Sequence, residues 1–254
     1  MTMISPLSDT DLYAIARDRL LNAGKRVLTA GCSLLRGDWC PILRRLPVAD
    51  AVALTFDDGP TPETTPRLLA QLAKAEATAT FFVSGARAVH HPELLAAIVA
   101  GGHHLYGHGW EHVNLKHRPD RAVADMDRVE ALLSAYRPTP SPYMLRLPYN
   151  AGFARRSMHR AIREFHPNPV FVWWSHDTYD YRIGGHCQTA ADVAVHCAIA
   201  ARRLRDQRGL GGAIVLMHEQ PFDVTSPMDH TAATVLLPMV LRALAERRLA
   251  TVAL

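Results

Sequence analysis

The chain has 254 residues, of which 48% are hydrophobic and 20% are charged, and its formal net charge is +4. A chain of this length can bury one substantial core, and β/α barrels of this size are commonly single domains. The basic residues are spread along the sequence instead of forming a dense run, which argues against a nucleic-acid partner.

The N-terminal residues carry no targeting or membrane signal. Charged side chains at Asp9, Asp11, Arg17 and Arg19 interrupt the first twenty residues, so no apolar stretch there has the length of a signal core or a membrane span. We therefore expect a cytoplasmic protein without a transmembrane segment. The cysteines form no C-x-x-C unit, which indicates neither a zinc knuckle nor a redox pair. They are Cys32, Cys40, Cys187 and Cys197.

Apolar runs and helical periodicity predict an α/β protein in which strands alternate with helices. The expected strands lie near residues 51–56, 79–83, 103–106, 143–146, 170–174, 213–217 and 250–253. Helices are expected from Pro66, over about 92–100, over about 120–136, and from Pro238, since proline is tolerated in a first helical turn. We expect residues 1–49 to form an N-terminal helical extension, with a helix near 9–23, packed on a domain of residues 50–254.

Two adjacent carboxylates end the first predicted strand. Asp57 and Asp58 follow the apolar run 51–54 and precede the turn-forming pair Gly59-Pro60. Consecutive strand residues point to opposite faces, so both carboxylates can serve one site only if the backbone leaves the strand at about Asp58. Taken alone, such a pair could equally be two solvated loop residues.

Two imidazoles four residues apart follow in the second quarter of the chain. Gly107 and Gly109 flank His108, which places His108 and His112 on a tight loop instead of a helix. Asp, His and His form a set of three protein ligands that leaves a coordination position for water at a hydrolytic metal. The chain has 14 histidines, so a chance pair is the alternative, and we interpret His103 and His104 as loop or strand-edge residues.

Three more strands end in polar residues. Arg146 ends the run 143–146, Asp177 and Asp180 follow the run 170–174, and His218 follows the run 213–217. In a β/α barrel the active site assembles at the carboxyl ends of the strands. The repetition therefore predicts one site built from all of these segments.

Together these segments resemble a known family. They are Thr55-Phe56-Asp57-Asp58-Gly59-Pro60, His108-x-x-x-His112, Arg146-x-Pro148-Tyr149, Trp174-Ser175-x-Asp177-x-x-Asp180-Tyr181 and Leu216-x-His218. In this order they resemble the five motifs of the polysaccharide deacetylase (NodB-homology, carbohydrate esterase family 4) domain, over about residues 51–254. The resemblance implies a distorted, incomplete (β/α)7 barrel.

The resemblance also implies a role for each matching residue. The implied metal ligands are Asp58, His108 and His112, and we choose zinc, with cobalt, nickel or manganese as alternatives. Asp57 resembles the general base, paired with Arg146, and His218 resembles the general acid, oriented by Asp180. The implied substrate-binding residues are Tyr149, through its backbone N–H, together with Leu216, Tyr181 and Trp174.

The implied activity is metal-dependent removal of the N-acetyl group from an amino sugar, in an oligo- or polysaccharide or a glycan precursor. Alternatives are an O-acetyl esterase, an N-deformylase, or a carbohydrate-binding pseudoenzyme. Gly109 stands where the family usually has Ser or Thr, so the histidine loop must be held in another way. Glu111 is expected to be exposed. Tyr181 replaces a commoner Trp, and Asn150 a commoner Gly, at the rim that meets the sugar.

Overall fold

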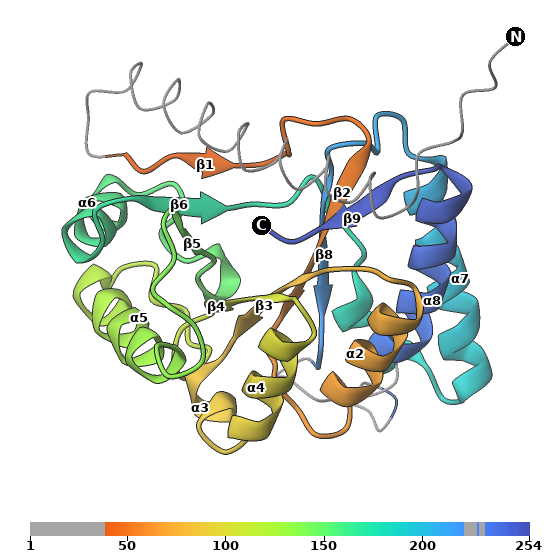
Figure 1. The fold of residues 1–254 in the computed structure, drawn as a ribbon, viewed down its shortest axis with the longest axis horizontal. Helices are drawn as coiled ribbons and strands as arrows, with labels where there is room; N and C mark the ends of the chain where they lie inside the picture. The colour runs from red at the N-terminus through yellow and green to blue at the C-terminus, as the bar shows by residue number, and fades with distance from the viewer. Residues whose placement is uncertain (1–38, 221–227, 229–231) are drawn as a thin grey trace, which may run out of the picture.

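The computed structural model describes residues 39–220, 228 and 232–254 (Figure 1). The predicted helix near 9–23 and Cys32 lie outside these residues. Among the helices of the described ranges, none is both long enough and apolar enough to cross a membrane.

The strands form two parallel sheets. The larger has the order β4-β3-β2-β8-β7, with β9 also paired to β2, and the smaller has the order β1-β6-β5. The larger sheet contains β2 (Ala51–Asp57), β3 (Thr80–Val83), β4 (His104–Gly107), β7 (His176–Asp177), β8 (Ile214–His218) and β9 (Ala250–Val252). The smaller contains β1 (Ile42–Leu43), β5 (Tyr143–Leu145) and β6 (Pro169–Val172). This α/β arrangement of two parallel sheets confirms the predicted incomplete barrel.

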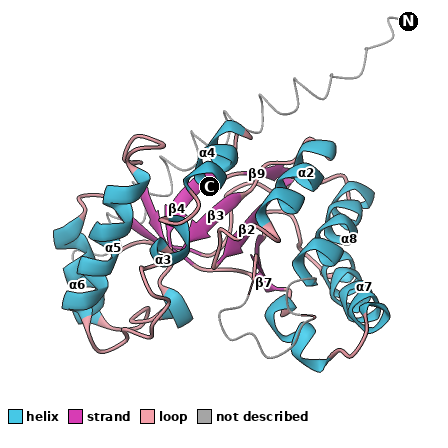
Figure 2. Cartoon of the chain, turned by 90° about the horizontal axis from the view of Figure 1, so that it is seen from below, coloured by secondary structure: helices cyan, strands magenta, loops and turns pink. Residues whose placement is uncertain are grey.

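Helices flank the sheets on both sides, with α5 and α6 on one side and α2, α7 and α8 on the other (Figure 2). Their bounds are α2 (Thr65–Lys74), α3 (Gly85–Ala88), α4 (Pro92–Ala100), α5 (Pro119–Leu133), α6 (Arg156–Phe165), α7 (Ala190–Asp206) and α8 (Ala232–Glu246). Three short 3-10 turns add η1 (Pro148–Asn150), η2 (Asp180–Arg182) and η3 (Gly184–His186).

The seven predicted strands are present, and two short strands, β1 and β7, were not predicted. Because β1 pairs with β6, residues 42 and 43 belong to the smaller sheet. The expected start of the last helix at Pro238 is wrong, since Pro238 lies inside α8. Proline removes one helical hydrogen bond, but the buried side chains of Leu236, Leu237 and Val240 keep this part of the helix packed against the core.

The alternation of side chains along β2 decides what reaches the interior of the barrel. All seven residues of β2 are buried, as expected for a central parallel strand covered on both faces. Val52, Leu54 and Phe56 belong to the core cluster shared with the surrounding helices. Ala51 and Ala53 belong to a second, inner cluster, and Asp57 continues this inner row at the carboxyl end of the strand.

Candidate active site

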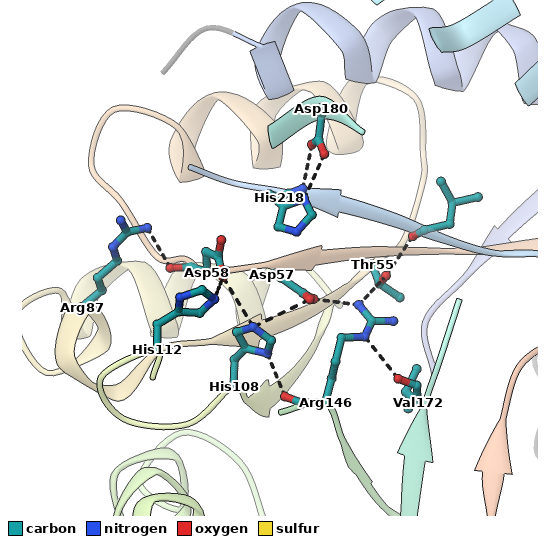
Figure 3. Close-up of polar contacts among 11 residues, drawn as sticks. Thr55, Asp57, Asp58, Arg87, His108, His112, Arg146, Val172, Asp180 and His218 are labelled. Carbon is teal, nitrogen blue, oxygen red and sulfur yellow. Dashed lines mark hydrogen bonds and ion pairs between the residues drawn. The ribbon is translucent and has the colours of Figure 1, made fainter. Parts of the chain in front are cut away.

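Asp57 and His218 lie side by side at the mouth of the barrel. They are register partners at the carboxyl ends of the adjacent parallel strands β2 and β8. On β8 the inner cluster holds Ile214 and the outer one holds Val215 and Met217, so period two brings His218 to the same inner face as Asp57. Figure 3 shows the Asp57 carboxylate turned toward Arg146 and His108, with His218 on the neighbouring strand.

The backbone turns out of β2 at Asp58, as the sequence predicted. Asp58 adopts a left-handed conformation with φ of 75°, and its side chain is 3% exposed. Gly59 follows, and a Cβ there would lie 1.6 Å from Oε1 of Glu219, so a larger residue would have to displace that side chain. The turn places Asp58 on the same side of the strand as Asp57.

Asp58, His108 and His112 converge on one point. One potential ligand atom from each lies within 4.8 Å of the others. Oδ1 of Asp58 is 3.4 Å from Nε2 of His108 and 3.1 Å from Nε2 of His112. Among the described residues no hydrogen bond satisfies this buried oxygen.

This cluster fits a cation. Nδ1 of His108 is 2.7 Å from the carbonyl oxygen of Arg146, so the ring N–H lies at Nδ1 and the Nε2 lone pair faces the Asp58 oxygen. Burial lowers the pKa of His108, although Asp57 and Asp58 oppose the shift, and this favours the neutral ring that binds metals. Two acceptors facing each other repel unless a positive charge lies between them. Metal-binding histidines are commonly oriented by a hydrogen bond from their other ring nitrogen to a carbonyl, and the contact of His108 Nδ1 with Arg146 is of this type.

The histidine loop is held without a hydroxyl at position 109. Gly109 has φ of +77°, and its carbonyl accepts a hydrogen bond from the Gly85 N–H at 3.0 Å. The carbonyl of Trp110 accepts from Ser84 Oγ at 2.8 Å and from the Ala86 N–H at 2.9 Å. The start of α3 therefore braces the loop from outside the motif.

Arg146 is buried behind Asp57. Its side chain is 1% exposed, and its Nη1 donates to Oδ1 of Asp57 at 2.7 Å and to Oγ1 of Thr55 at 2.9 Å. Its Nε donates to the carbonyl of Val172, on β6 of the smaller sheet, at 3.3 Å. Together with the contacts to Thr55 and Asp57 on β2, this side chain ties the smaller sheet to the larger one. Because Oδ1 of Asp57 is engaged by Arg146, Oδ2 is the oxygen that faces His108, at 3.8 Å from Nε2.

His218 is paired with Asp180 from η2. Nδ1 of His218 lies 2.9 Å from Oδ1 of Asp180, and the His218 backbone N–H donates to Oδ2 at 2.7 Å. Burial opposes protonation of His218, but the charge and hydrogen bond of Asp180, with smaller contributions from the charges of Asp58 and Asp57, outweigh it and raise the pKa to about 9. His218 is therefore a cation near neutral pH, with Nε2 left to face the open space.

A cavity of about 380 Å³ collects these groups. Of the residues predicted from the sequence, only Asp180 stands outside its lining, behind His218. The lining residues are Asp57, Asp58, His108, His112, Arg146, Leu147, Tyr149, Asn150, Trp174, Asp177, Tyr181, Leu216 and His218. Tyr149 stands at the rim, 54% exposed, with its ring 4.7 Å from that of His112. Glu111 is exposed, as expected.

Other histidines lie elsewhere. His103 immediately precedes β4 and is 5% exposed, with Nδ1 accepting from the Ala79 N–H at 3.3 Å. His104 begins β4, at one edge of the larger sheet. Neither lines the cavity, which agrees with their interpretation as loop or strand-edge residues.

Three polar residues at the site were not singled out from the sequence. Thr55 bonds Arg146, Arg87 on α3 bonds the Asp58 carbonyl at 2.9 Å, and Glu219 is 1% exposed beside the Asp58 turn. Burial raises the pKa of Glu219 to about 8. Its position directly after His218 was a usable signal. Nothing in the sequence around Arg87 indicated a contact with a strand end.

Comparisons with known proteins find related sequences and related folds. The sequence profile described as polysaccharide deacetylase matches residues 46–165. A chitooligosaccharide deacetylase of Rhizobium leguminosarum bv. trifolii is 32% identical over 177 residues, which cover 66% of this chain and 71% of that protein.

The peptidoglycan-N-acetylglucosamine deacetylase PgdA of Listeria monocytogenes is 29% identical over 184 residues, or 71% of this chain and 34% of that protein. This chain thus spans about a third of that relative. Among solved structures, the Bc1960 peptidoglycan N-acetylglucosamine deacetylase superposes with a TM-score of 0.65 at 26% identity. The match covers 85% of this chain and 89% of that one.

Proposed function

The chain belongs to the polysaccharide deacetylase family, and from this membership we propose that it hydrolyses the N-acetyl group of an amino sugar in an oligo- or polysaccharide or a glycan precursor. One observation carries the proposal. The Asp58, His108 and His112 cluster, the Asp57 carboxylate and the His218 imidazole face a single cavity.

Asp58, His108 and His112 would hold a divalent cation. Nitrogen and carboxylate oxygen donors suit zinc, and cobalt, nickel or manganese accept similar sets. When bound, such a cation polarises the acyl carbonyl and lowers the pKa of water.

Asp57 is the proposed general base. Oδ1 is held by Arg146 at 2.7 Å, and this contact fixes the carboxylate and balances its charge. Oδ2, on the side of His108, is then the atom that takes the proton of the attacking water. The backbone N–H of Tyr149 at the cavity rim is the proposed donor to the oxyanion that forms on the acyl carbonyl.

His218 is the proposed general acid. Asp180 holds the ring through Nδ1, so the proton that is transferred lies on Nε2, which faces the leaving nitrogen. An amine leaves only when protonated, whereas an alcohol is a better leaving group and depends less on an acid. A histidine kept charged by a buried carboxylate therefore supports an amide substrate. Leu216, Tyr181 and Trp174 would enclose the acyl methyl and the sugar.

The test is a screen of purified, metal-replete protein for acetate release. N-acetylated monosaccharides, oligosaccharides, nucleotide sugars and lipid-linked sugars are assayed beside acetylated xylan and N-formyl sugars. We expect acetate release from at least one N-acetylated substrate, and much slower release from acetylated xylan and from N-formyl sugars. Faster release from xylan or from N-formyl sugars would establish the esterase or deformylase instead. No turnover of any of them would favour the carbohydrate-binding pseudoenzyme.

A further inference from the structure

Two ionisable residues behind the cavity have no part in the proposed reaction. Glu219 follows the acid His218, and Arg87 lies on α3. Neither lines the cavity. The Glu219 carboxyl is 1% exposed, and its Oε1 has no hydrogen-bond partner among the described residues. Burying a carboxyl in this way costs stability, so its presence calls for a physical reason.

Arg87 joins two segments that are far apart in the sequence. Its Nη1 donates to the carbonyl oxygen of Asp58 at 2.9 Å and to that of Gln220 at 2.8 Å. The contact with Asp58 is visible in Figure 3. One guanidinium thus ties the turn that carries Asp58 to the segment that follows His218.

Glu219 makes a second connection between the same two segments. Its backbone N–H donates to the carbonyl oxygen of Asp57 at 2.9 Å. Its Oε2 accepts the hydroxyl of Thr65, and that hydroxyl accepts the Thr61 N–H at 2.8 Å. The carboxyl also fills the space beside Gly59, where a Cβ would collide with it.

We propose that Glu219, Thr65 and Arg87 are positioning residues, forming a buried brace that fixes the Asp57–Asp58 turn against the end of β8. The brace sets the separation between the base and metal ligand on one side and the acid His218 on the other. Catalytic groups must be held to about 0.5 Å by residues around them. The guanidinium of Arg87 lies close to the carboxyl groups of Asp58 and Glu219, and it opposes part of the rise that burial causes in the pKa of Glu219.

The brace makes a prediction for metal binding and for turnover, and the turnover part rests on the proposed function. In Arg87→Met, both carbonyl contacts are lost while the side chain keeps a similar length. We expect the affinity for Zn²⁺, measured by competition with a chelator, and kcat each to fall about 10- to 100-fold, as for other supports of metal sites. KM should stay within about twofold, because the brace does not touch the cavity. Arg67→Met, an exposed change on neighbouring α2, is the matched control and should change neither quantity.

Thr65 gives a test that changes almost no volume. Thr65→Val removes the hydroxyl between Glu219 and the Thr61 N–H, and should weaken Zn²⁺ binding and lower kcat by about 10-fold. Thr65→Ser restores the hydroxyl and should return both to within about twofold of the wild type. If the role of Thr65 were only structural, Thr65→Val would lower the unfolding temperature but would leave Zn²⁺ affinity and kcat unchanged.

The outcomes separate the brace from the activity. Wild-type protein that binds Zn²⁺ but releases no acetate contradicts the proposed function alone, and the Zn²⁺ affinities still judge the brace. Arg87→Met and Thr65→Val variants with wild-type Zn²⁺ affinity overturn the brace. If Arg87→Met does not fold, Arg87→Lys, which keeps the charge but reaches fewer carbonyls, takes its place with the same expected direction.

Discussion

The two sides of the cavity use charge pairing in opposite directions. On the base side, a buried arginine holds a carboxylate, Asp57, through a 2.7 Å contact. On the acid side, a buried carboxylate, Asp180, holds an imidazole, His218, through a 2.9 Å contact. In each pair the partner behind the cavity holds the other through a short polar contact, and Asp180 also raises the pKa of His218. One scaffold thus supports the proposed base and the proposed acid with partners of opposite sign.

Removing the base should have the largest effect. We expect Asp57→Asn to lower kcat for acetate release by about 10³-fold, since a general base contributes 10²- to 10⁴-fold. Zn²⁺ affinity should be retained because the ligand cluster is Asp58, His108 and His112. Acetate release at the wild-type rate would remove Asp57 from the role. Asp127→Asn, exposed on α5, serves as the control.

Removing the support of the acid should have a smaller effect and a pH signature. The pKa of His218 is raised to about 9, with Asp180 the largest favourable influence against burial. Activity that needs protonated His218 therefore falls as the pH rises through about 9. In Asp180→Asn we expect kcat to drop about 10²-fold and the alkaline limb of kcat/KM to move toward the ordinary histidine value near 6.5. An unmoved limb would assign it to another group.

A pair of substrates sharpens the comparison further. The proposed reaction on an N-acetyl sugar needs both sides of the cavity, whereas an O-acetyl ester has a leaving group that needs less protonation. The loss caused by Asp180→Asn should therefore be about 10-fold smaller on the ester, while the loss caused by Asp57→Asn stays the same. Equal losses from Asp180→Asn on both substrates would argue against proton donation by His218.

The smallest effect concerns stability. A folded-state pKa above the unfolded value stabilises the fold fully below the unfolded pKa, and this stabilisation disappears as the pH rises through the folded pKa. For His218 this window runs from about 6.5 to about 9. Between these limits the free energy of unfolding of metal-free wild type should fall relative to that of Asp180→Asn, by up to about 3 kcal/mol. Urea titrations at pH 6 and pH 9.5 measure the difference, and a constant gap would contradict it.

The parts of the site that lie at strand ends could be predicted from the sequence. The apolar runs of β2 and β8 are long enough to be recognised as strands in the sequence. Because both strands are parallel, the polar residues that end them, Asp57 and His218, lie at the same edge of the sheet. Strands β1 and β7 have two residues each, too short for any periodicity to appear. Proline is common in the first turn of a helix, so the sequence predicted a helix start at Pro238. Packing of the neighbouring side chains against the core instead keeps Pro238 inside α8.

The supporting residues could not be predicted because their partners are distant in the sequence. Arg87 and Gln220 are 133 positions apart. No local sequence pattern distinguishes an arginine that bonds buried backbone carbonyls from one that is exposed to solvent. The sequence did predict that the histidine loop needs support from elsewhere, because Gly109 offers no hydroxyl. Its source, Ser84 at the start of α3, follows only from the folded arrangement.

The pairing of β2 has a consequence for biosynthesis. The strand that delivers Asp57 is completed by β8 and β9, with Ala53 opposite Ile214 and Ala51 opposite Ala250. Asp57 precedes β8 and β9 in the chain, so its surroundings are complete only after these two strands have paired with β2. Nascent chains stalled before residue 214 should therefore bind no Zn²⁺, whereas chains that include β8 and β9 should bind it.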